Sequence, residues 1–528
     1  MIHLPREETK LMVAVHGWSG IILGLLLYAV VLTGMVAVFA EEIGVWSAGH
    51  VAQGAAFERP IDAPLQKLAR RTPAEFHEAV DVYEVGDRNL GLFFHLHETA
   101  PNGEVIERGI NYQLDRSGRV VGEQRGTGEQ VFGPSNDDAL SHFLIDTHVQ
   151  LHVPDPWGLL LTGILGLAML VAAISGLLIH RHLFKDIFTL RRSASAVLVD
   201  RDRHSVAGTW SLPFAFILAF TGSFFSFYGT VGVPIVAMAA FGGSQEAFNE
   251  TVYGSGEKPD PSPRITGSLD HIVADARGRI GQLPTFITIE QFGRADARVT
   301  TFHDPKAGGI EPVSLIYRGA TGAYVRESPS IGTRPSVGGT LTAIMGPLHF
   351  GNFAGLASKS VWFGLGFAMC YVTFTGLRLW LVRRRDGGSA LGWLERIVTV
   401  IGFGLPLALL GAAIGFFFTM PLGTAVFWTP ASFLIVSAAA ILAGFTIPTN
   451  GLLMRAHQIA IGALLVAMPP IRLLTGGPGW GAALAAGQPM IVAIDLMTFL
   501  AGVWTLWRLI AASRADNSNV SARLKPAE

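Results

Sequence analysis

The hydrophobic residues of this chain gather in long runs, separated by polar stretches of very different length. Apolar segments long enough to cross a bilayer occupy eight ranges: 11–40, 157–180, 206–240, 361–382, 397–420, 425–447, 457–474 and 490–510. A helix needs about 20 apolar residues to span a hydrocarbon core about 30 Å thick. The pattern therefore predicts eight membrane spans, or seven if the seventh, which Pro469, Pro470 and Arg472 interrupt, does not cross.

Two long polar segments, 41–147 and 241–348, carry a different pattern. Alternating runs such as Leu90–His97 and Thr285–Glu290 predict strands, because a half-buried strand has one apolar face. Residues 64–71 have the spacing of an amphipathic helix. We therefore expect each segment to fold as a small α+β domain.

Composition supports a membrane protein. Hydrophobic residues make up 50% of the 528 residues and charged residues only 15%, against about 25% charged in globular proteins. So few charges could not cover the surface of a soluble protein of this size. The net charge of −1 excludes a globally basic nucleic-acid-binding protein. The single cysteine, Cys370, excludes an intramolecular disulfide, an iron–sulfur cluster and a cysteine-based zinc site, so metal chemistry would depend on the 16 histidines or on carboxylates.

The distribution of lysine and arginine predicts the orientation, because cytoplasmic loops carry an excess of both. The loops 181–203 and 383–396, the head and the tail are rich in them and fall on one side of an eight-span arrangement. Both termini are therefore expected in the cytoplasm, and the first span is too long for a signal-peptide core and is expected to stay as an anchor. The expected organisation is a first span (11–40), an α+β domain (41–147), a second span (148–180), a third span (204–240), a second α+β domain (241–348), a fourth span (349–382) and a four-helix membrane extension (397–510).

The first four spans contain an internal repeat with countable spacings. The first and third spans share a histidine, a glycine four residues on, and Thr-Gly at offsets 17 and 18: His16, Gly20, Thr33 and Gly34, then His204, Gly208, Thr221 and Gly222. The second and fourth spans share a preceding Leu-His and a later Ser/Thr-Gly-Leu: Leu151-His152 with Ser175-Gly176-Leu177, and Leu348-His349 with Thr375-Gly376-Leu377. The repeating unit is therefore predicted to be helix, α+β domain, helix, used twice.

These motifs resemble the PepSY-associated transmembrane family. The resemblance rests on the histidine-led first span ending in Thr-Gly, on the Leu-His before the second span, and on the Tyr-x-x-Asp-x-x-Gly-x-Val stretch that begins at Tyr112, and it covers about residues 10–385. It implies a multi-pass protein of the bacterial inner membrane, in contact with lipid and carrying two periplasmic PepSY domains. Several similar proteins are associated with iron acquisition as haem-b ferric-siderophore reductases. The resemblance thus implies haem b, a ferric siderophore or other periplasmic acceptor, and a separate electron donor.

Histidines at the span ends are the candidate haem ligands. A single histidine there is more often an interfacial anchor, but these cluster by depth: His16, His180 and His204 at the predicted cytoplasmic ends, His148, His152 and His349 at the periplasmic ends. Neutral imidazole is the usual axial ligand of low-spin haem iron, and a relay across the bilayer needs a site near each face. The repeat predicts two haems, whose iron binds His16 with His204 and His152 with His349. His180 is the alternative ligand at the inner site, and His148 at the outer site.

Glycines near these histidines have two interpretations. Four of them would let a macrocycle approach the backbone of spans one and three: Gly20, Gly34, Gly208 and Gly222. Close packing of the helices would require the same small residues.

The preferred hypothesis is a membrane haem-b oxidoreductase of the ferric-siderophore reductase type. The sequence has no Gly-x-Gly-x-x-Gly after a strand and no P-loop, so electrons would come from a separate cytoplasmic or membrane donor. One alternative is a PepSY-domain protein without redox activity, which binds peptides or regulates a peptidase. The other is a transporter, which would more often place polar residues at mid-span.

Other polar residues give weaker predictions. His95 and His97 alternate with apolar residues and share one face of a predicted strand, where a solvated surface is favoured over a metal site. Asp495, inside the last span, is expected either at the interface or paired with Arg472. His457 is expected at the cytoplasmic interface.

Overall fold

The computed structural model describes residues 5–49, 54–86, 88–99, 105–180, 188, 191, 196–244, 247–248, 251–252, 259–306, 309–329, 332 and 334–523. Most of the arginine-rich loop between residues 181 and 195 lies outside these described residues. The contacts of the chain divide it into two units. The helical unit comprises 1–49, 134–230 and 354–528, and the sheet unit comprises 50–133 and 231–353.

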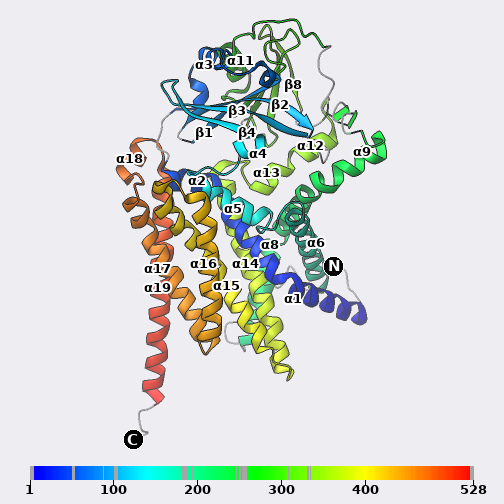
Figure 1. Cartoon of the computed structure of the whole chain (residues 1–528). Coiled ribbons are helices and arrows are strands. Elements are labelled where there is room, and N and C mark those ends of the chain that lie inside the picture. The colour runs from blue at the N-terminus through cyan, green and yellow to red at the C-terminus, as the bar shows by residue number, and fades with distance from the viewer. Residues whose placement is uncertain are drawn as a thin grey trace. The chain divides into compact units, whose positions relative to one another are not determined.

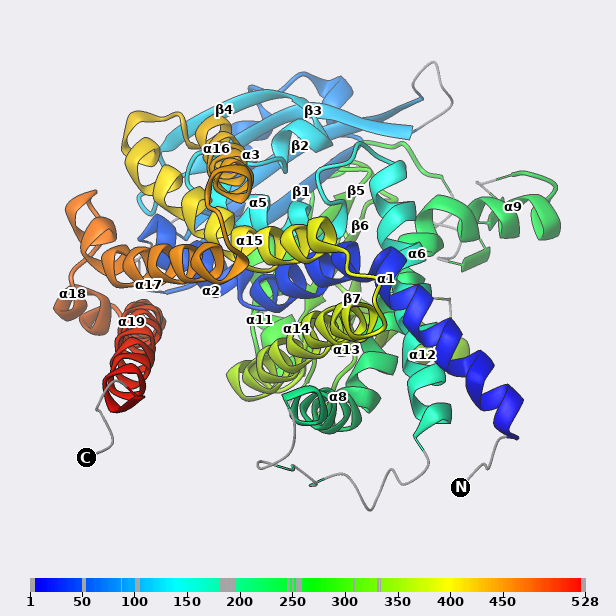
Figure 2. The ribbon, with the colours of Figure 1, turned by 90° about the horizontal axis from the view of Figure 1, so that it is seen from below.

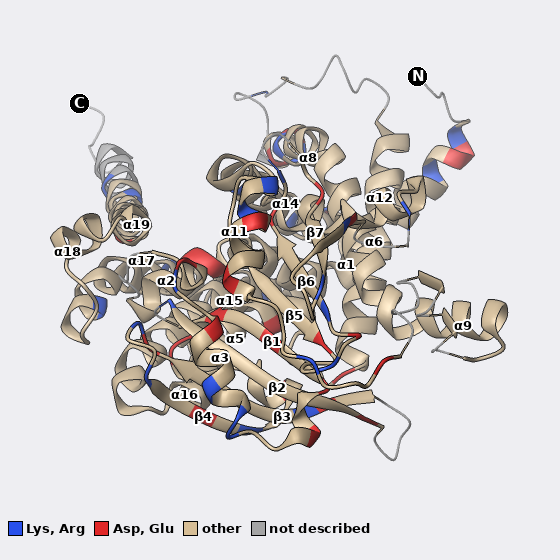
Figure 3. Ribbon diagram, turned by 90° about the horizontal axis from the view of Figure 1, so that it is seen from above, with Lys and Arg blue, Asp and Glu red and all other residues tan. Residues whose placement is uncertain are grey.

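Eight helices in the described part of the chain are long and apolar enough to cross a membrane, which confirms the predicted number. They are α1 (Arg6–Ala37), α6 (Trp157–Ile179), α8 (Ala196–Phe227) with its continuation through the π-helical turn η3 (Tyr228–Gly232) into α9 (Val233–Phe241), α14 (Gly355–Asp386), α15 (Gly392–Thr419), α16 (Ala425–Thr446), α17 (Asn450–Leu474) and α19 (Pro489–Arg523). The seventh span is a single helix that includes Pro469 and Pro470. In Figure 3 the long helices are tan over most of their length, as lipid-facing segments must be.

The first four spans pack as a bundle. Within it α1 contacts α6, α6 contacts α8, α8 contacts α14, and α14 contacts α1 (Figures 1 and 2). The C-terminal helices continue from this bundle, since α15 contacts α14 and α1, α16 and α17 contact α15, and α19 contacts α17. Glycines allow the closest of these contacts: a Cβ atom on Gly411 of α15 would lie 2.5 Å from Val436 of α16.

The Leu-His motifs that precede the second and fourth spans lie outside the long helices. Helix α5 (Ala139–Val149) ends before Leu151 and His152, whose φ angles are 53° and 56°, and α6 starts only at Trp157. Likewise α13 (Met345–Phe350) ends at Gly351, and α14 starts at Gly355. A right-handed helix cannot continue through residues with positive φ, so His152 and His349 lie outside the long helices.

The remaining helices of the described residues are short. In the helical unit they are α2 (Ala40–Ala48), η4 (Met420–Leu422) and α18 (Trp480–Ala485). In the sheet unit they are η1 (Ala56–Glu58), α3 (Asp62–Ala69), η2 (Ala74–His77), α4 (Gly128–Val131), α11 (Leu269–Ile280) and α12 (Val337–Ala343).

Both polar segments contribute to one antiparallel sheet, in the order β4-β3-β2-β1-β5-β6-β7-β8. Its strands are β1 (Ala79–Val85), β2 (Asn89–Thr99), β3 (Val105–Leu114), β4 (Val120–Thr127), β5 (Phe286–Glu290), β6 (Arg298–His303), β7 (Val313–Arg318) and β8 (Tyr324–Ser328). The two expected α+β domains are therefore joined into one. The reason is that β1 and β5 pair, with Ala79 opposite Glu290, and a separation would expose both as apolar edges.

Helices α3 and α11 pack their apolar residues into the core of this sheet, with Val80, Val82, Ile287 and Ile289 at its centre. Their N-termini are cross-linked by carboxylates. The backbone N–H of Ile61 donates to Asp270 Oδ1 at 2.6 Å, and the N–H of Leu269 donates to Asp62 Oδ1 at 2.7 Å. Each half of the repeat thus satisfies a helix end of the other half.

Candidate functional site

Two histidines from matching positions of the repeat come together inside the helical unit. His16 lies on α1 and His204 on α8, and their ring centroids are 6.2 Å apart, with 69° between the ring planes. The two rings come from different helices, so the packing of the helices determines their distance. The packing of α1 and α8 against α6 and α14 brings them to one place.

Backbone carbonyls of the neighbouring helices hold both rings. His16 Nδ1 lies 3.0 Å from the carbonyl oxygen of Ala172 on α6, and His204 Nδ1 lies 3.0 Å from that of Val372 on α14. A carbonyl oxygen only accepts, so Nδ1 carries the proton in each neutral ring and Nε2 carries the lone pair. This tautomer is the one in which histidine binds a metal through Nε2.

The repeated Ser/Thr-Gly-Leu motif supplies the rest of each ring's surroundings. Ser175 Oγ lies 3.2 Å from Nδ1 of the first ring, and Thr375 Oγ1 lies 3.3 Å from Nδ1 of the second. A Cβ atom on Gly176 or Gly376 would lie only 3.3 or 3.0 Å from Cε1 of the same ring. The hydroxyl therefore assists the carbonyl, and the glycine leaves room for the imidazole.

A cavity of about 730 Å³ lies beside these rings, lined by α1, α6, α8 and α14. Cofactor sites have volumes of about 300–1,000 Å³. Gly20 and Gly208, matched in the repeat, both line it. A Cβ atom on Gly20 would meet no atom within 4 Å, and one on Gly208 only a methyl group of Val372 at 3.8 Å. Both glycines therefore border open space and are not needed for helix packing.

Part of the cavity wall is cationic. Among its described residues it has three arginines, Arg191, Arg201 and Arg383, against one acid, Asp202. Arg191 Nε donates to Asp202 Oδ2 at 2.7 Å, and the Arg201 guanidinium lies 3.8 Å from the same carboxylate. Most of the remaining wall is apolar. The cavity thus fits a largely apolar molecule that carries carboxylates at one edge.

His180 also lines the cavity, although its ring is engaged differently. It follows the last residue of α6, and its Nε2 lies 2.6 Å from Ser205 Oγ. The nitrogen that His16 and His204 leave open is therefore bonded in His180. This arrangement makes His180 a wall residue of the site, beside the facing pair.

His148 has the same anchoring as the facing pair. Its Nδ1 lies 3.0 Å from the carbonyl oxygen of Val30 on α1. A Cβ atom on Gly34 would lie 2.6 Å from Cε1 of this ring, so Gly34 makes room for a histidine of the chain itself. Gly34 therefore packs against a side chain of the protein, and this contact does not support the interpretation in which it lets a cofactor approach the backbone.

His152 and His349 have other surroundings. The Nε2 of His152 lies 2.6 Å from Thr147 Oγ1, and its ring stacks on Phe143 with 4.8 Å between centroids. His349 lies on α13 of the sheet unit, with its ring 5.6 Å from that of Phe350. The two residues of this predicted pair thus belong to different units of the chain.

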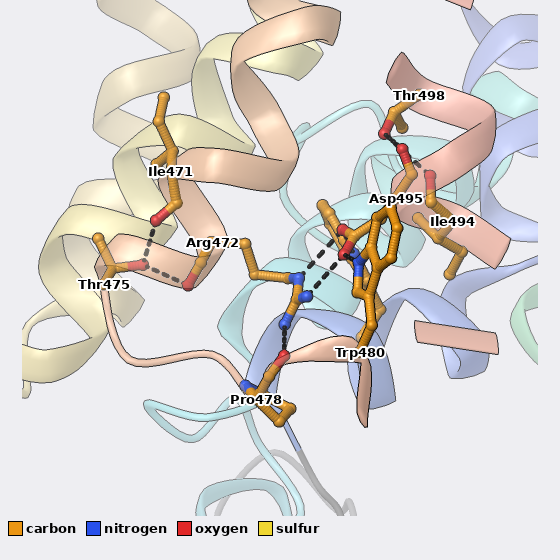
Figure 4. A network of polar contacts seen from close by, with 9 residues as sticks. Ile471, Arg472, Thr475, Pro478, Trp480, Ile494, Asp495 and Thr498 are labelled. Atoms are coloured by element: carbon orange, nitrogen blue, oxygen red, sulfur yellow. Dashed lines mark hydrogen bonds and ion pairs between the residues drawn. The ribbon is translucent and has the colours of Figure 1, made fainter. Parts of the chain in front are cut away.

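A second polar cluster surrounds the fully buried Arg472 and Asp495 of the C-terminal helices (Figure 4). Arg472 donates to both oxygens of Asp495, at 3.1 and 2.6 Å, and to the carbonyl oxygen of Pro478 at 3.0 Å. The indole N–H groups of Trp46 and Trp480 donate to the same carboxylate, each at 2.8 Å. Of the two interpretations of Asp495, pairing with Arg472 is confirmed. Every charge in this network is paired, which indicates a structural role.

His457, expected at the cytoplasmic interface, is buried between two helices. It is only 3% exposed, and its Nδ1 lies 2.8 Å from the carbonyl oxygen of Leu453 in its own helix. Contacts between α15 and α17 bury it, and these contacts are not visible in the local sequence.

Sequence reasoning missed the groups that hold the rings. The repeated Ser/Thr-Gly-Leu motif singled out Ser175 and Thr375, but it did not predict that their hydroxyl groups lie beside His16 and His204. The anchoring carbonyls carry no side-chain signal at all. Arg191, Arg201 and Arg383 were used only to orient the chain, although they also line the cavity.

Comparison with known proteins places this arrangement in a family. A family model described as the PepSY-associated TM region matches residues 13–383. An uncharacterized protein of Pseudomonas aeruginosa is 26% identical over 361 residues, which cover 62% of this chain and 86% of that protein. The matched region contains the first four spans, both polar segments and the facing histidines. The chain therefore belongs to the PepSY-associated transmembrane family.

Proposed function

We propose that the chain is a haem-b electron-transfer protein in which His16 and His204 are the axial ligands of one haem. The observation that carries this proposal is the pair of anchored rings, 6.2 Å apart. Metal–nitrogen bonds of about 2 Å on both sides of one ion leave two imidazole centres about 6 Å apart. The spacing and the shared tautomer both fit bis-histidine ligation.

The cavity wall also fits the cofactor. Gly20 and Gly208 provide the open space that a flat macrocycle needs, and the arginine edge suits its propionate carboxylates. Bound haem would supply a one-electron carrier that cycles between ferric and ferrous iron. The chain itself orients the imidazoles through the carbonyl oxygens of Ala172 and Val372.

From the sequence repeat alone we also propose a second haem, with His349 and either His148 or His152 as its ligands. The repeat favours His152 as the ligand. His148 is the alternative, and its Nδ1 lies beside a carbonyl oxygen as in the inner pair. The Nε2 of His152 lies 2.6 Å from Thr147 Oγ1.

The proposed reaction is the one-electron reduction of a periplasmic ferric siderophore or other ferric chelate, so the protein would be an oxidoreductase. Fe(II) binds hard oxygen ligands less tightly than Fe(III), so the metal would leave the chelator. The electrons would come from a separate cytoplasmic or membrane donor, because the sequence has no nicotinamide motif. Family resemblance supports this acceptor and a place in the inner membrane with both termini in the cytoplasm.

The test is the visible spectrum of the purified full-length protein before and after reduction with dithionite. We expect sharp low-spin α and β bands, and the loss of one haem component in both His16→Ala and His204→Ala. Alanine at His349, and at whichever of His148 and His152 is the ligand, should remove the other component. His142→Ala is the matched control. This histidine of α5 is about one-third exposed and its Nε2 lies 3.7 Å from Asp138, and it is not among the proposed ligands, so the spectrum should not change.

Two results would contradict the proposal. One is haem-free protein from haem-replete cells, which would leave a PepSY-domain peptide-binding protein as the better account. The other is an unchanged spectrum in both His16→Ala and His204→Ala, which would show that the facing pair does not bind haem.

A further inference from the structure

A second group of potential metal ligands lies in the sheet unit, around a pocket of about 430 Å³. His95 and His97 share one face of β2, as predicted, and Glu107 of β3 is opposite His97 in the strand register. A ligand atom from each of these three residues lies within 4.8 Å of the others. Two imidazoles and a carboxylate thus converge on one point of the sheet surface.

His95 is the decisive residue of this group. The expected solvated surface is wrong for it, because it is only 2% exposed and stacks on Phe93 with 4.7 Å between centroids. Neither ring nitrogen of His95 has a hydrogen-bond partner among the described residues. A buried polar group left in this state costs about 1–3 kcal/mol, and such cases usually mark a bound ion or water.

Each imidazole also has a carboxylate beside one of its nitrogens. Asp81 Oδ2 lies 3.2 Å from His95 Nε2, an ion-pair distance without hydrogen-bond geometry. Glu78 Oε1 lies 2.8 Å from His97 Nδ1. Histidines that bind metals usually present their other nitrogen to a carboxylate or carbonyl in this way. His95 Nδ1 and His97 Nε2 are then the nitrogens left for an ion.

We propose that His95, His97 and Glu107 bind one divalent transition-metal ion, with Asp81 and Glu78 orienting the two rings. Two nitrogens and one carboxylate oxygen suit Zn²⁺ or Fe²⁺, whereas Mg²⁺ and Ca²⁺ prefer oxygen ligands alone. Three protein ligands leave further coordination positions for water or a substrate. This site does not depend on the proposed haem function.

The second half of the repeat has no histidine at the position that corresponds to His95. The buried Val80 of β1 corresponds to the buried Ile287 of β5, because each begins an alternating apolar pair at the centre of the core. Next to them, β1 and β2 place His95 opposite Ala79, whereas β5 and β6 place Phe302 opposite Phe286. The histidine is therefore not required by the strand pairing itself, which strengthens a binding role in the first half.

The experiment is a Zn²⁺ titration of the full-length protein after chelator treatment, by calorimetry and by elemental analysis. We expect one Zn²⁺ per chain, with binding weakened more than about 100-fold by His97→Ala or Glu107→Gln, and about 10–100-fold by Asp81→Asn or Glu78→Gln. His97→Ala is the preferred variant, because this side chain is 44% exposed and its loss should not affect folding.

Two controls separate this site from other histidines. His271→Ala, at an exposed position on α11, should leave Zn²⁺ binding unchanged. The double variant His16→Ala/His204→Ala should also retain it, so the metal site and the proposed haem site can fail independently. Equal Zn²⁺ binding in the wild type and in the double variant His95→Ala/His97→Ala would overturn the proposal, as would a wild type that binds no Zn²⁺.

Competition under anaerobic conditions identifies the ion. Displacement of Zn²⁺ by Fe²⁺ at comparable concentration would assign the site to iron. Retention of Zn²⁺ against excess Fe²⁺ would assign the site to zinc. A given site generally binds Zn²⁺ more tightly than Fe²⁺. Either result supports a site for a transition metal.

Discussion

Backbone carbonyls fix the tautomer of three histidines in the helical unit. His16, His204 and His148 each have Nδ1 at 3.0 Å from a carbonyl oxygen of a neighbouring helix. Substituting the residue that carries the carbonyl would not remove this contact. The Nδ1–H tautomer of these three rings is therefore fixed by helix packing.

Glycine substitutions test whether the cavity holds a flat cofactor. In a helix interior alanine is more favourable than glycine by about 1 kcal/mol, and a Cβ atom on Gly20 would meet no protein atom within 4 Å. Without a cofactor, Gly20→Ala should thus be neutral or stabilising. With haem bound beside it, we expect Gly20→Ala and Gly208→Ala to lower haem content or shift its absorption bands.

The matched control is Gly364→Ala on α14. A Cβ atom there also meets nothing within 4 Å, but Gly364 does not line the cavity. Haem content measured per mole of protein should be unchanged in this variant. Equal haem content and spectra in all three variants would contradict a cofactor that lies against these glycines.

The buried Arg472–Asp495 pair should be essential for the stability of the C-terminal helices. Removing one partner of a buried ion pair leaves an unpaired charge and costs about 3–5 kcal/mol. We expect Asp495→Leu to lower the thermal midpoint of the detergent-solubilised protein strongly. The double variant Arg472→Met/Asp495→Leu should recover part of this loss, since no buried charge remains.

An exposed ion pair provides the comparison for the Asp495 and Arg472 variants. Arg108 and Glu98 of the sheet are about half exposed, and pairs of this kind contribute about 0–1 kcal/mol. Arg108→Ala should therefore barely change the midpoint. If Asp495→Leu had an equally small effect, the buried network would not be a determinant of stability.

At the candidate site, the sequence predicted the histidines but not their surroundings. Equal offsets within the repeat were enough to match His16 with His204, because repeated helices pack in equivalent ways. They could not show that Nε2 of His152 is bonded to Thr147. That contact depends on a left-handed turn at Leu151 and His152, a conformation for which these residue types give no signal.

At the scale of elements, the exchanged caps make α3 and α11 depend on each other. Neither Ile61 nor Leu269 has an acceptor for its N–H in its own helix, and each finds a carboxylate of the other half. Ser268 Oγ also donates to Asp62, at 2.5 Å. Local helix stability in one half is therefore tied to the fold of the other half.

Removal of either capping carboxylate should loosen the start of the helix that it caps. The loss of a cap costs about 1 kcal/mol, which corresponds to a roughly fivefold increase in opening. We expect Asp62→Ala to speed hydrogen exchange at the first turn of α11, and Asp270→Ala at the first turn of α3. Mass spectrometry of the full-length protein would resolve both segments.

Glu75→Ala is the control for this pair, because Glu75 is exposed and lies outside both helices. Its exchange pattern should match the wild type. If each substitution changed exchange only in its own helix, the exchange of caps between the halves would be refuted.

Element prediction succeeded where a signal was local and failed where it was not. Apolar runs of about 20 residues gave the eight spans, because the bilayer imposes that length. The apolar run that begins at residue 157 matches α6. No local pattern signalled the breaks at His152 and Gly351 that separate the preceding histidines from α6 and α14, since each depends on a single backbone conformation. The pairing of β1 with β5 joins residues that are about 200 positions apart, and no local pattern specifies such a partner.

At the scale of the whole molecule, both the helical unit and the sheet unit consist of two corresponding halves. In the helical unit, α1 with α6 corresponds to α8 with α14, and each pair contributes one anchored histidine. In the sheet unit, β1 to β4 and β5 to β8 form the two halves of one sheet. The motifs at matched offsets therefore reflect one structural unit used twice.

The orientation of the chain gives a prediction for the molecule in cells. Three spans separate the exposed Ser117, in the turn between β3 and β4, from the exposed Ser389 after α14, so the two must face opposite sides of the membrane. The arginines near Ser389 should hold it in the cytoplasm. In a Cys370→Ala background, an impermeant maleimide should label Ser117→Cys once the outer membrane is permeabilised, but Ser389→Cys only after lysis.

A third position distinguishes eight spans from seven. Helices α15, α16 and α17 and most of the last span lie between Ser389 and the exposed Ser513, which is near the C-terminal end of the span in α19. If all four cross, Ser513→Cys should be protected in intact cells like Ser389→Cys, because an even number of crossings returns the chain to the same side. Labelling of Ser513→Cys without lysis would mean that one helix does not cross, and α17 would be the first to question, since Arg472 lies within it. The complete pairing of that arginine with Asp495 is the physical reason to expect that α17 does cross.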